Sequence, residues 1–255
     1  MLLVFDIGNT NTVVGVFRQD KLVVDWRLAT DRQKTVDEYG ILVRSLFNDQ
    51  KLEAGQIKAV IISSVVPPVT GLFTQMSKKY FAVTPLIVEA GVKTGLSIKI
   101  ENPREVGADM VVNAVAAIHL YGPPLVIVDF GTATTFCAIA PNGDYLGGAI
   151  APGLSISGEA LFQRTAKLPR IEIIKPKNAI GRNTIISMQA GLFYGYIGLV
   201  ENLISRIKIE MNCKPQVIAT GELAELIATE TKLIDTINPD LTLHGLRFIY
   251  ELNQN

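Results

Sequence analysis

The sequence predicts an α/β protein built from two similar halves, each a mixed β-sheet flanked by helices. The first observation is an internal repeat: Asp-Ile-Gly-Asn-Thr-Asn-Thr at 6–12 is matched by Asp-Phe-Gly-Thr-Ala-Thr-Thr at 129–135, with the Asp, the Gly and the last Thr in register. The second observation is that each motif follows a short apolar strand and opens a run of closely spaced strands, which only an antiparallel meander can accommodate. Duplication explains such a repeat better than chance, and we place the two halves at residues 1–121 and 122–255.

The composition agrees with a well-packed globular protein. Hydrophobic residues make up 48% of the 255 residues and charged residues 19%, which supports a large core rather than disorder. Lys plus Arg and Asp plus Glu are both 24, so the net charge is zero. No basic field therefore favours nucleic acid or an anionic membrane as a partner.

The cysteines and the hydrophobic segments indicate a cytosolic protein. Cys137 and Cys213 have no neighbour at CxxC spacing, so we expect free thiols in a reducing compartment rather than a disulfide or a metal site. The apolar start ends at Asp6, which is too early for a signal peptide. The uncharged stretches 110–128 and 183–200 contain polar residues and glycines, so we expect buried elements rather than membrane spans.

In the first half, β-branched and apolar runs predict strands, and apolar residues at three- and four-residue spacing predict helices. The expected strands are 2–5, 13–17, 22–28, 59–66 and 86–88. The expected helices are 36–49, 69–80 and 106–121. Asp20-Lys21 forms the turn within the meander, and Pro67-Pro68 ends the fourth strand.

The second half repeats the meander and then becomes mostly helical. The expected strands are 125–128, 135–140, 145–150 and 217–219. The expected helices are 155–165, 185–208, 223–230 and 241–252. Asn142-Gly143 is a hairpin signal between two of these strands. The long helix is uncharged up to residue 200, so we expect it to be buried on most sides.

The repeated motif suits a polyphosphate site. A glycine lets the backbone approach a phosphate closely, and successive N–H groups with Asn or Thr side chains can donate to phosphate oxygens. An Asp at a strand end can hold Mg²⁺ directly or through water. One such turn is a weak signal. Two at the same place in a repeat predict that the turns around Asp6 and Asp129 face each other and hold a polyphosphate from both sides.

The two turns resemble the phosphate loops of the actin, hexokinase and heat-shock-70 superfamily, which implies duplicated ribonuclease-H-like (actin-like ATPase) domains. Within that superfamily the whole chain is similar to the type III pantothenate kinases. The segments that carry the resemblance are Asp6–Asn11, Ser63–Pro68, Glu101–Asp109, Asp129–Thr135, Gly147–Gly153, Lys167–Pro169, Gly181–Thr184 and Leu241–Leu246. The resemblance implies transfer of the ATP γ-phosphoryl group to the primary hydroxyl of pantothenate, the first step of coenzyme A synthesis.

The resemblance also implies a role for each matching residue. Asp109 would be the general base on the attacking hydroxyl, Asp129 would bind a monovalent cation, K⁺ or NH₄⁺, and Asp6 would hold Mg²⁺ with ATP. The residues implied at the ATP phosphates are Asp6, Ile7, Gly8, Asn9, Thr10, Asn11, Thr12, Val13 and Thr132. Those implied at pantothenate are Gly107, Ala108, Asp109, Met110 and Thr184. A family member is expected to be a homodimer with its substrate site near the interface, and the long uncharged helix is our candidate for that contact.

Three residues depart from the family pattern. Met110 stands where the family has an Arg that can grip the pantothenate carboxylate, and methionine has no donor. Ile100 replaces a Tyr of the substrate site, and Glu222 replaces a second glycine after Gly221. These departures leave two alternatives open. One is a nucleotide-binding protein with weakened turnover, acting as a regulatory factor or as one subunit of a mixed dimer. The other is a kinase for a small alcohol without a carboxylate.

Overall fold

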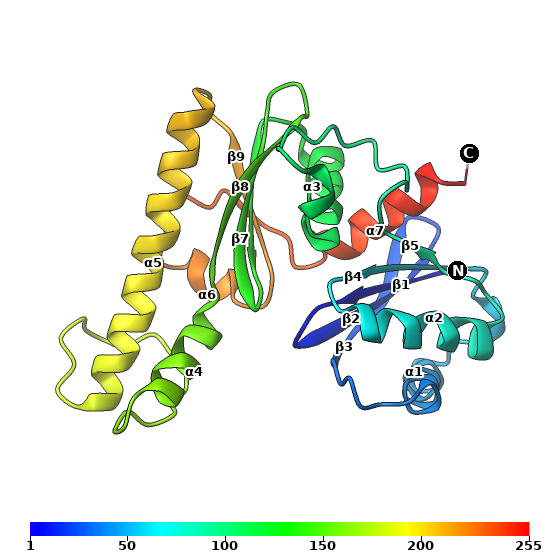
Figure 1. Cartoon of the computed structure of the whole chain (residues 1–255), viewed down its shortest axis with the longest axis horizontal. Coiled ribbons are helices and arrows are strands. Elements are labelled where there is room, and N and C mark those ends of the chain that lie inside the picture. Colours follow the sequence, from blue (N-terminus) through cyan, green and yellow to red (C-terminus); the bar gives the residue numbers. More distant parts are fainter. Residues whose placement is uncertain (255) are drawn as a thin grey trace. The chain divides into compact units, whose positions relative to one another are not determined.

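The computed structural model describes residues 1–254, which form two five-stranded mixed sheets with helices beside them (Figure 1). The first sheet has the order β3-β2-β1-β4-β5, and the second has the equivalent order β8-β7-β6-β9-β10. The strands are β1 Leu2–Ile7, β2 Asn11–Arg18, β3 Lys21–Ala29, β4 Ala59–Ser64, β5 Leu86–Ile87, β6 Leu125–Phe130, β7 Ala133–Ile139, β8 Tyr145–Pro152, β9 Gln216–Thr220 and β10 Thr236–Ile237. The predicted α/β fold and its duplication are confirmed.

Each sheet is an antiparallel meander extended by two parallel strands. In the first sheet β1 pairs antiparallel with β2 and parallel with β4. In the second sheet β6 pairs antiparallel with β7 and parallel with β9. The parallel strands require long crossovers, and most of the helices lie in those connections. The helices are α1 Val36–Asp49, α2 Pro67–Phe81, α3 Ala108–Tyr121, α4 Leu154–Arg164, α5 Thr184–Met211, α6 Ala224–Ala228 and α7 Leu241–Leu252.

The turn of the second meander is one residue shorter than the turn of the first. Ile7 pairs with Thr12 across the first turn, whereas Phe130 pairs with Thr134 across the second. Thr134 therefore takes the place of Thr12, and both side chains are fully buried. The predicted register, which matched Thr12 with Thr135, is wrong by one residue because turn length cannot be read from the motif.

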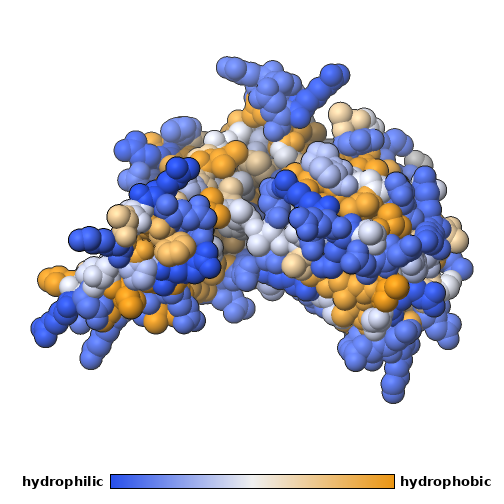
Figure 2. Space-filling model, turned by 60° about the horizontal axis from the view of Figure 1, so that its bottom comes forward, coloured by the Kyte–Doolittle hydropathy of each residue, from blue (hydrophilic) through white to orange (hydrophobic). Residues whose placement is uncertain are grey.

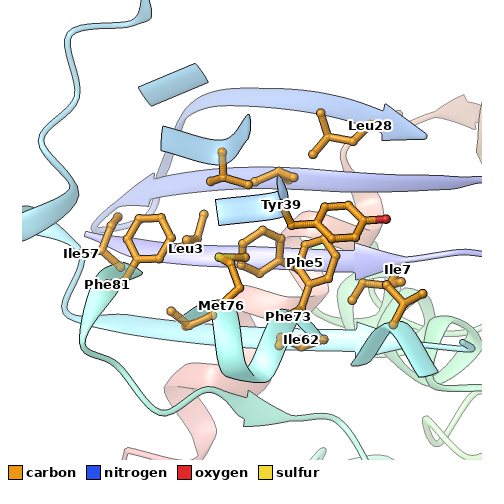
Figure 3. Packing of buried hydrophobic residues seen from close by; sticks show 14 of the residues in the cluster. Leu3, Phe5, Ile7, Leu28, Tyr39, Ile57, Ile62, Phe73, Met76 and Phe81 are labelled. Atoms are coloured by element: carbon orange, nitrogen blue, oxygen red, sulfur yellow. The ribbon is translucent and has the colours of Figure 1, made fainter. Parts of the chain in front are cut away.

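Aromatic side chains fill one face of the first sheet. Phe5 of β1 meets Phe73 of α2 with ring centroids 4.9 Å apart, and Tyr39 of α1 meets Phe73 at 4.7 Å (Figure 3). All three are fully buried. Burial of one such side chain stabilises the fold by about 1.5–3 kcal/mol, so this cluster anchors β1, the strand that carries Asp6.

The opposite face of the first sheet is covered by α7 and by the first half of α3. Leu243, Leu246 and Val112 pack there against Val4 and Ile61. The two helices approach closely, since a Cβ at Gly245 would lie 2.1 Å from the Val112 carbonyl oxygen.

The chain divides into two compact units. The first contains residues 1–96, 102–116 and the stretch from Asp240, and the second contains 97–101 and 117–239. The predicted domains, 1–121 and 122–255, stay a prediction, but the packing differs from them in two respects. The division falls inside α3, and α7 belongs with the first unit because its apolar face is buried on the first sheet.

Most helix boundaries follow from local signals. Helix α1 has the predicted bounds, because Thr35 and Glu38 form a capping box in which Thr35 N donates to Glu38 Oε2 at 2.7 Å. Helix α2 begins two residues earlier than predicted, with Pro67 in its first turn, where proline is favoured. The two-residue strand β10 was not predicted. Across residues 1–254, no helix combines the length and the apolar character needed to cross a membrane.

Candidate active site

Strand β1 ends at the first Asp-x-Gly turn. Asp6 is half-buried, whereas Asn9 and Thr10 at the tip of the turn are exposed. The Gly8 N–H donates to the Asn11 carbonyl at 3.0 Å and closes the turn. A Cβ at Gly8 would lie 3.0 Å from the same oxygen, so a side chain there would press on the turn. The turn thus offers exposed polar groups beside a carboxylate.

The neighbours of Asp6 across the sheet are fixed by the strand register. Asp6 pairs with Val13 on β2 and with Ser63 on β4. Paired residues on neighbouring strands point to the same face of a sheet. Asp6 and Ser63 therefore lie on the face that α7 and the first half of α3 cover, together with Val4 and Ile61.

Asp109 lies in the first turn of α3 and is half-buried. Its Oδ1 accepts a hydrogen bond from the Met110 N–H at 2.8 Å. Burial raises the pKa of the Asp109 carboxyl above its ordinary value, and the backbone N–H groups of Met110 and of Asp109 itself oppose that shift. A carboxylate in the first helical turn also gains from the helix dipole. Burial outweighs these opposing effects, so Asp109 is a carboxyl with a raised pKa that the Met110 N–H holds in place.

Gly107 makes room for that carboxyl. A Cβ at Gly107 would lie 2.5 Å from Asp109 Oδ1. Since Val111 N donates to the Gly107 carbonyl at 3.1 Å, Gly107 is also where the helix begins. A larger residue at 107 would have to displace the Asp109 side chain.

The second Asp-x-Gly turn is enclosed by a glycine that follows β9. Asp129 pairs with Thr135 on β7 and with Thr220 on β9. Gly221 has φ +92°, and a Cβ there would lie 2.6 Å from Asp129 Oδ1 and 2.7 Å from the Phe130 nitrogen. Backbone at Gly221 therefore lies against the carboxylate, which only glycine permits.

The rest of this turn is held from two sides. Gly153 donates its N–H to the Thr132 carbonyl at 3.1 Å, while the Thr132 residue itself is exposed. Thr134 and Tyr196 of α5 share a short hydrogen bond between their hydroxyl groups. Burial raises the pKa of Tyr196 to about 12; the hydrogen bond with Thr134 opposes this shift and the charge of Asp129 adds to it, so the hydroxyl stays protonated. Helix α5 thus supports the strand that leaves the turn.

The structure distributes the predicted site residues between the two units. The first unit contains the turn from Asp6 to Val13 and the segment from Gly107 to Met110. The second unit contains Asp129, Thr132 and Thr184, an exposed residue at the start of α5. The predicted facing of the two turns stays a prediction.

The three departures from the family pattern have different surroundings. Met110 is half-buried and donates its backbone N–H to Asp109. Ile100 lies against β8, with its Cγ2 3.3 Å from the place a Cβ of Gly147 would take. Glu222 is exposed directly after Gly221.

Three features of the site could not be seen in the sequence: the burial of Ser63 beside Asp6, the contact of Tyr196 with Thr134, and the close approach of Gly221 to Asp129. Ser63 lies in a quoted motif, but no pattern in the chain indicates that its side chain is buried beside Asp6. A glycine directly after a short β-strand was a usable signal for Gly221, since such glycines often adopt positive φ. Tyr196 lacked any signal, because its contact with Thr134 joins residues 62 positions apart.

Comparison with known proteins shows the family of this chain. The family model for type III pantothenate kinase matches residues 2–206. A type III pantothenate kinase from Geobacillus kaustophilus is 57% identical over 99% of this chain and 98% of its own length. One from Bacillus cytotoxicus is 56% identical over 99% and 97%. The activator of the 2-hydroxyisocaproyl-CoA dehydratase from Clostridium difficile, solved with bound ADPNP, shares the fold at TM-score 0.53 and 10% identity over 99% of this chain and 97% of its own.

Proposed function

This chain belongs to the type III pantothenate kinase family, and we propose that it transfers the γ-phosphoryl group of ATP to the primary hydroxyl of pantothenate. A kinase of this family uses ATP as its phosphoryl donor. The observation that carries the assignment to this site is Asp109, a half-buried carboxyl held by the Met110 N–H at the start of α3.

The first turn fits the phosphates of ATP. Asn9 and Thr10 are exposed at its tip, and Gly8 has no side chain that could cover the backbone of the turn. Exposed N–H and side-chain donors are what phosphate oxygens need. We assign the ATP phosphates to the turn from Asp6 to Val13 and to Thr132, which is likewise exposed.

Two carboxylates suit two cations. ATP is bound with Mg²⁺, which neutralises charge on the transferred phosphoryl group. Asp6 would hold Mg²⁺ beside the phosphates, because Mg²⁺ keeps several waters and accepts one or two protein carboxylates. Asp129, enclosed by Gly221, would bind the monovalent cation, K⁺ or NH₄⁺.

Asp109 would act as the general base. It would orient the pantothenate hydroxyl and accept its proton as the new bond to phosphorus forms. A base whose pKa is raised toward the working pH accepts a proton more readily than an ordinary Asp, and burial of Asp109 raises its pKa. Gly107, Ala108, Met110 and Thr184 would line the pantothenate site.

An apolar surface of the second unit supports a homodimer. On the face drawn in Figure 2, hydrophobic residues are interspersed with hydrophilic ones. Seven exposed large hydrophobic side chains fall between residues 150 and 186, on β8, on α4, on the segment that follows it and on the first turn of α5. They are Ile150, Ile156, Phe162, Ile174, Ile180, Ile185 and Ile186. A second copy of the chain would cover such a patch.

We also assign the protein to the cytosol, where coenzyme A synthesis begins.

A coupled ADP-release assay with pantothenate, ATP, Mg²⁺ and K⁺ tests the proposed function. We expect ADP release that depends on pantothenate and disappears in Asp109→Asn. A panel of small alcohols without a carboxylate serves as the substrate control. If ADP release at high enzyme concentration were the same with and without pantothenate, the proposed reaction would be wrong.

A further inference from the structure

The hydroxyl of Ser63 is buried without a hydrogen-bond partner. Ser63 lies near the end of β4 and is 0% exposed. Among the side chains of residues 1–254, its Oγ is one of three buried polar atoms without a partner, and the other two lie on α7. Buried polar groups in native proteins are nearly always paired, and an unpaired one is costly. Within residues 1–254, the Ser63 hydroxyl is therefore a buried polar group that the fold itself does not satisfy.

The register places Asp6 next to this hydroxyl. Ser63 and Asp6 are directly paired on parallel strands and point to the same face. The other residue paired with Asp6 is Val13, which has no polar side chain. Val88, beyond β4, belongs to the apolar cluster on the same face. Asp6 is thus the polar neighbour of Ser63 along this row of the sheet.

The neighbouring serine, Ser64, has hydrogen-bond partners at the start of α2, whereas Ser63 has none within residues 1–254. Ser64 Oγ accepts hydrogen bonds from the Val66 N–H at 3.0 Å and from Thr70 Oγ1 at 2.7 Å. Successive residues of a strand point to opposite faces, so Ser64 faces α2 while Ser63 faces the side of Asp6. The contacts beside the start of α2 therefore account for Ser64, and the buried hydroxyl of Ser63 needs another reason.

The second unit repeats the arrangement. Thr220 on β9 pairs with Asp129 as Ser63 on β4 pairs with Asp6. Thr220 is 2% exposed. A buried hydroxyl residue beside the aspartate is thus a feature of both repeats, so Ser63 is not an isolated occurrence.

We propose that Ser63 is a positioning residue of the Mg²⁺–nucleotide site, with its hydroxyl donating into the water layer that the Asp6 carboxylate shares with Mg²⁺. This inference rests on the proposed function, which supplies the nucleotide and its metal. A serine hydroxyl can donate and accept at once, and a bridging water is nearly as good a partner as a direct one. The hydroxyl would orient Asp6 for the hydrated metal and would leave ATP without Mg²⁺ unaffected.

The variant Ser63→Ala tests this, with Ser77→Ala as the matched control. Ser77 is also 0% exposed, but its hydroxyl donates to the Phe73 carbonyl at 2.7 Å within α2. Titration calorimetry gives the Kd of ATP with Mg²⁺ and with EDTA, and melting of the ligand-free protein gives Tm. For Ser63→Ala we expect the Kd with Mg²⁺ to rise about five- to tenfold, the Kd in EDTA to stay within about twofold of the parent value, and Tm not to fall.

The control and the contrary outcomes separate the alternatives. Ser77→Ala should lower Tm and leave both Kd values unchanged. If Ser63→Ala bound ATP like the parent in both conditions, or lost affinity equally in both, Ser63 would have no role at the metal. If the parent itself bound no ATP with Mg²⁺, the proposed function would fail, and the assignment of Ser63 with it.

Discussion

The two Asp-x-Gly turns share one framework and differ at one neighbouring position. Asp6 and Asp129 each end a central strand, and each is paired with a buried hydroxyl residue on the parallel strand. After that residue the two halves diverge: Ser64 Oγ accepts a hydrogen bond from the Val66 N–H just before α2, whereas Gly221 brings backbone against the Asp129 carboxylate. Under the proposed function, the enclosed Asp129 carboxylate would hold one compact ion, and the Asp6 carboxylate beside the unpaired Ser63 hydroxyl would hold a hydrated one.

Asp109→Asn should give the largest effect, since Asp109 is the proposed general base. We expect kcat to fall about 10³-fold, because a general base contributes about 10²–10⁴. In the parent, kcat should rise with pH as Asp109 loses its proton and then level off. Steady-state kinetics over about four pH units, from about pH 5 to about pH 9, measure the fall in kcat of the variant and the pH dependence of kcat in the parent.

The same variant should be more stable than the parent at neutral pH. Because the folded-state pKa of Asp109 is raised, its ionised form is penalised as pH climbs from the unfolded to the folded pKa. The variant carries no such penalty, so its Tm advantage should be full at neutral pH and vanish in acid. An equal Tm difference at every pH would contradict this origin.

Asp6→Asn and Asp129→Asn test the comparison directly. Loss of the Asp6 charge should raise the Mg²⁺ concentration for half-maximal activity about 100-fold and leave the K⁺ response intact, since removing a charged partner costs about 2–3 kcal/mol. Asp129→Asn should do the reverse. Activity titrations with each cation are the measurement, and a shift of the same cation in both variants would break the assignment.

Gly221→Ala should be more damaging than Gly143→Ala. Both glycines have positive φ, +92° and +86°, but a Cβ at Gly143 meets nothing within 4 Å. The backbone cost, about 1–2 kcal/mol, is common to both. The contact with Asp129 and Phe130 should add about 2 kcal/mol at Gly221, read from urea unfolding. Equal losses would mean that Gly221 does not enclose the carboxylate.

Gly107→Ala should give the smallest effect. Its Cβ would displace the Asp109 carboxyl by a side-chain rotation, so kcat should fall about tenfold, within the range for a misplaced catalytic group. Gly71→Ala is the control, because a Cβ there meets nothing within 4 Å. Steady-state kinetics and Tm are the measurements. A Gly107→Ala variant with parental kcat would show that the Asp109 carboxyl need not move when a Cβ is added at 107.

The sequence by itself determined the fold class, the repeat and the motif residues. The helix at 36–49 could be predicted because its capping box and its apolar spacing are local. The turns at Asp6 and Asp129 could be found because Asp and Gly must stand at fixed places in such a turn. Turn length was beyond reach, so Thr135 was matched where Thr134 belongs.

Only the tertiary structure decided which residues surround the two aspartates. Ser63 becomes a neighbour of Asp6 through the register of β1 with β4, and Gly221 encloses Asp129 through the register of β6 with β9. Helix α7 joins the first unit through contacts with β1, at the other end of the chain. The physical reason is common to all three: burial and close approach depend on segments brought together over long sequence distances, whereas motifs and periodicity report only the chain nearby.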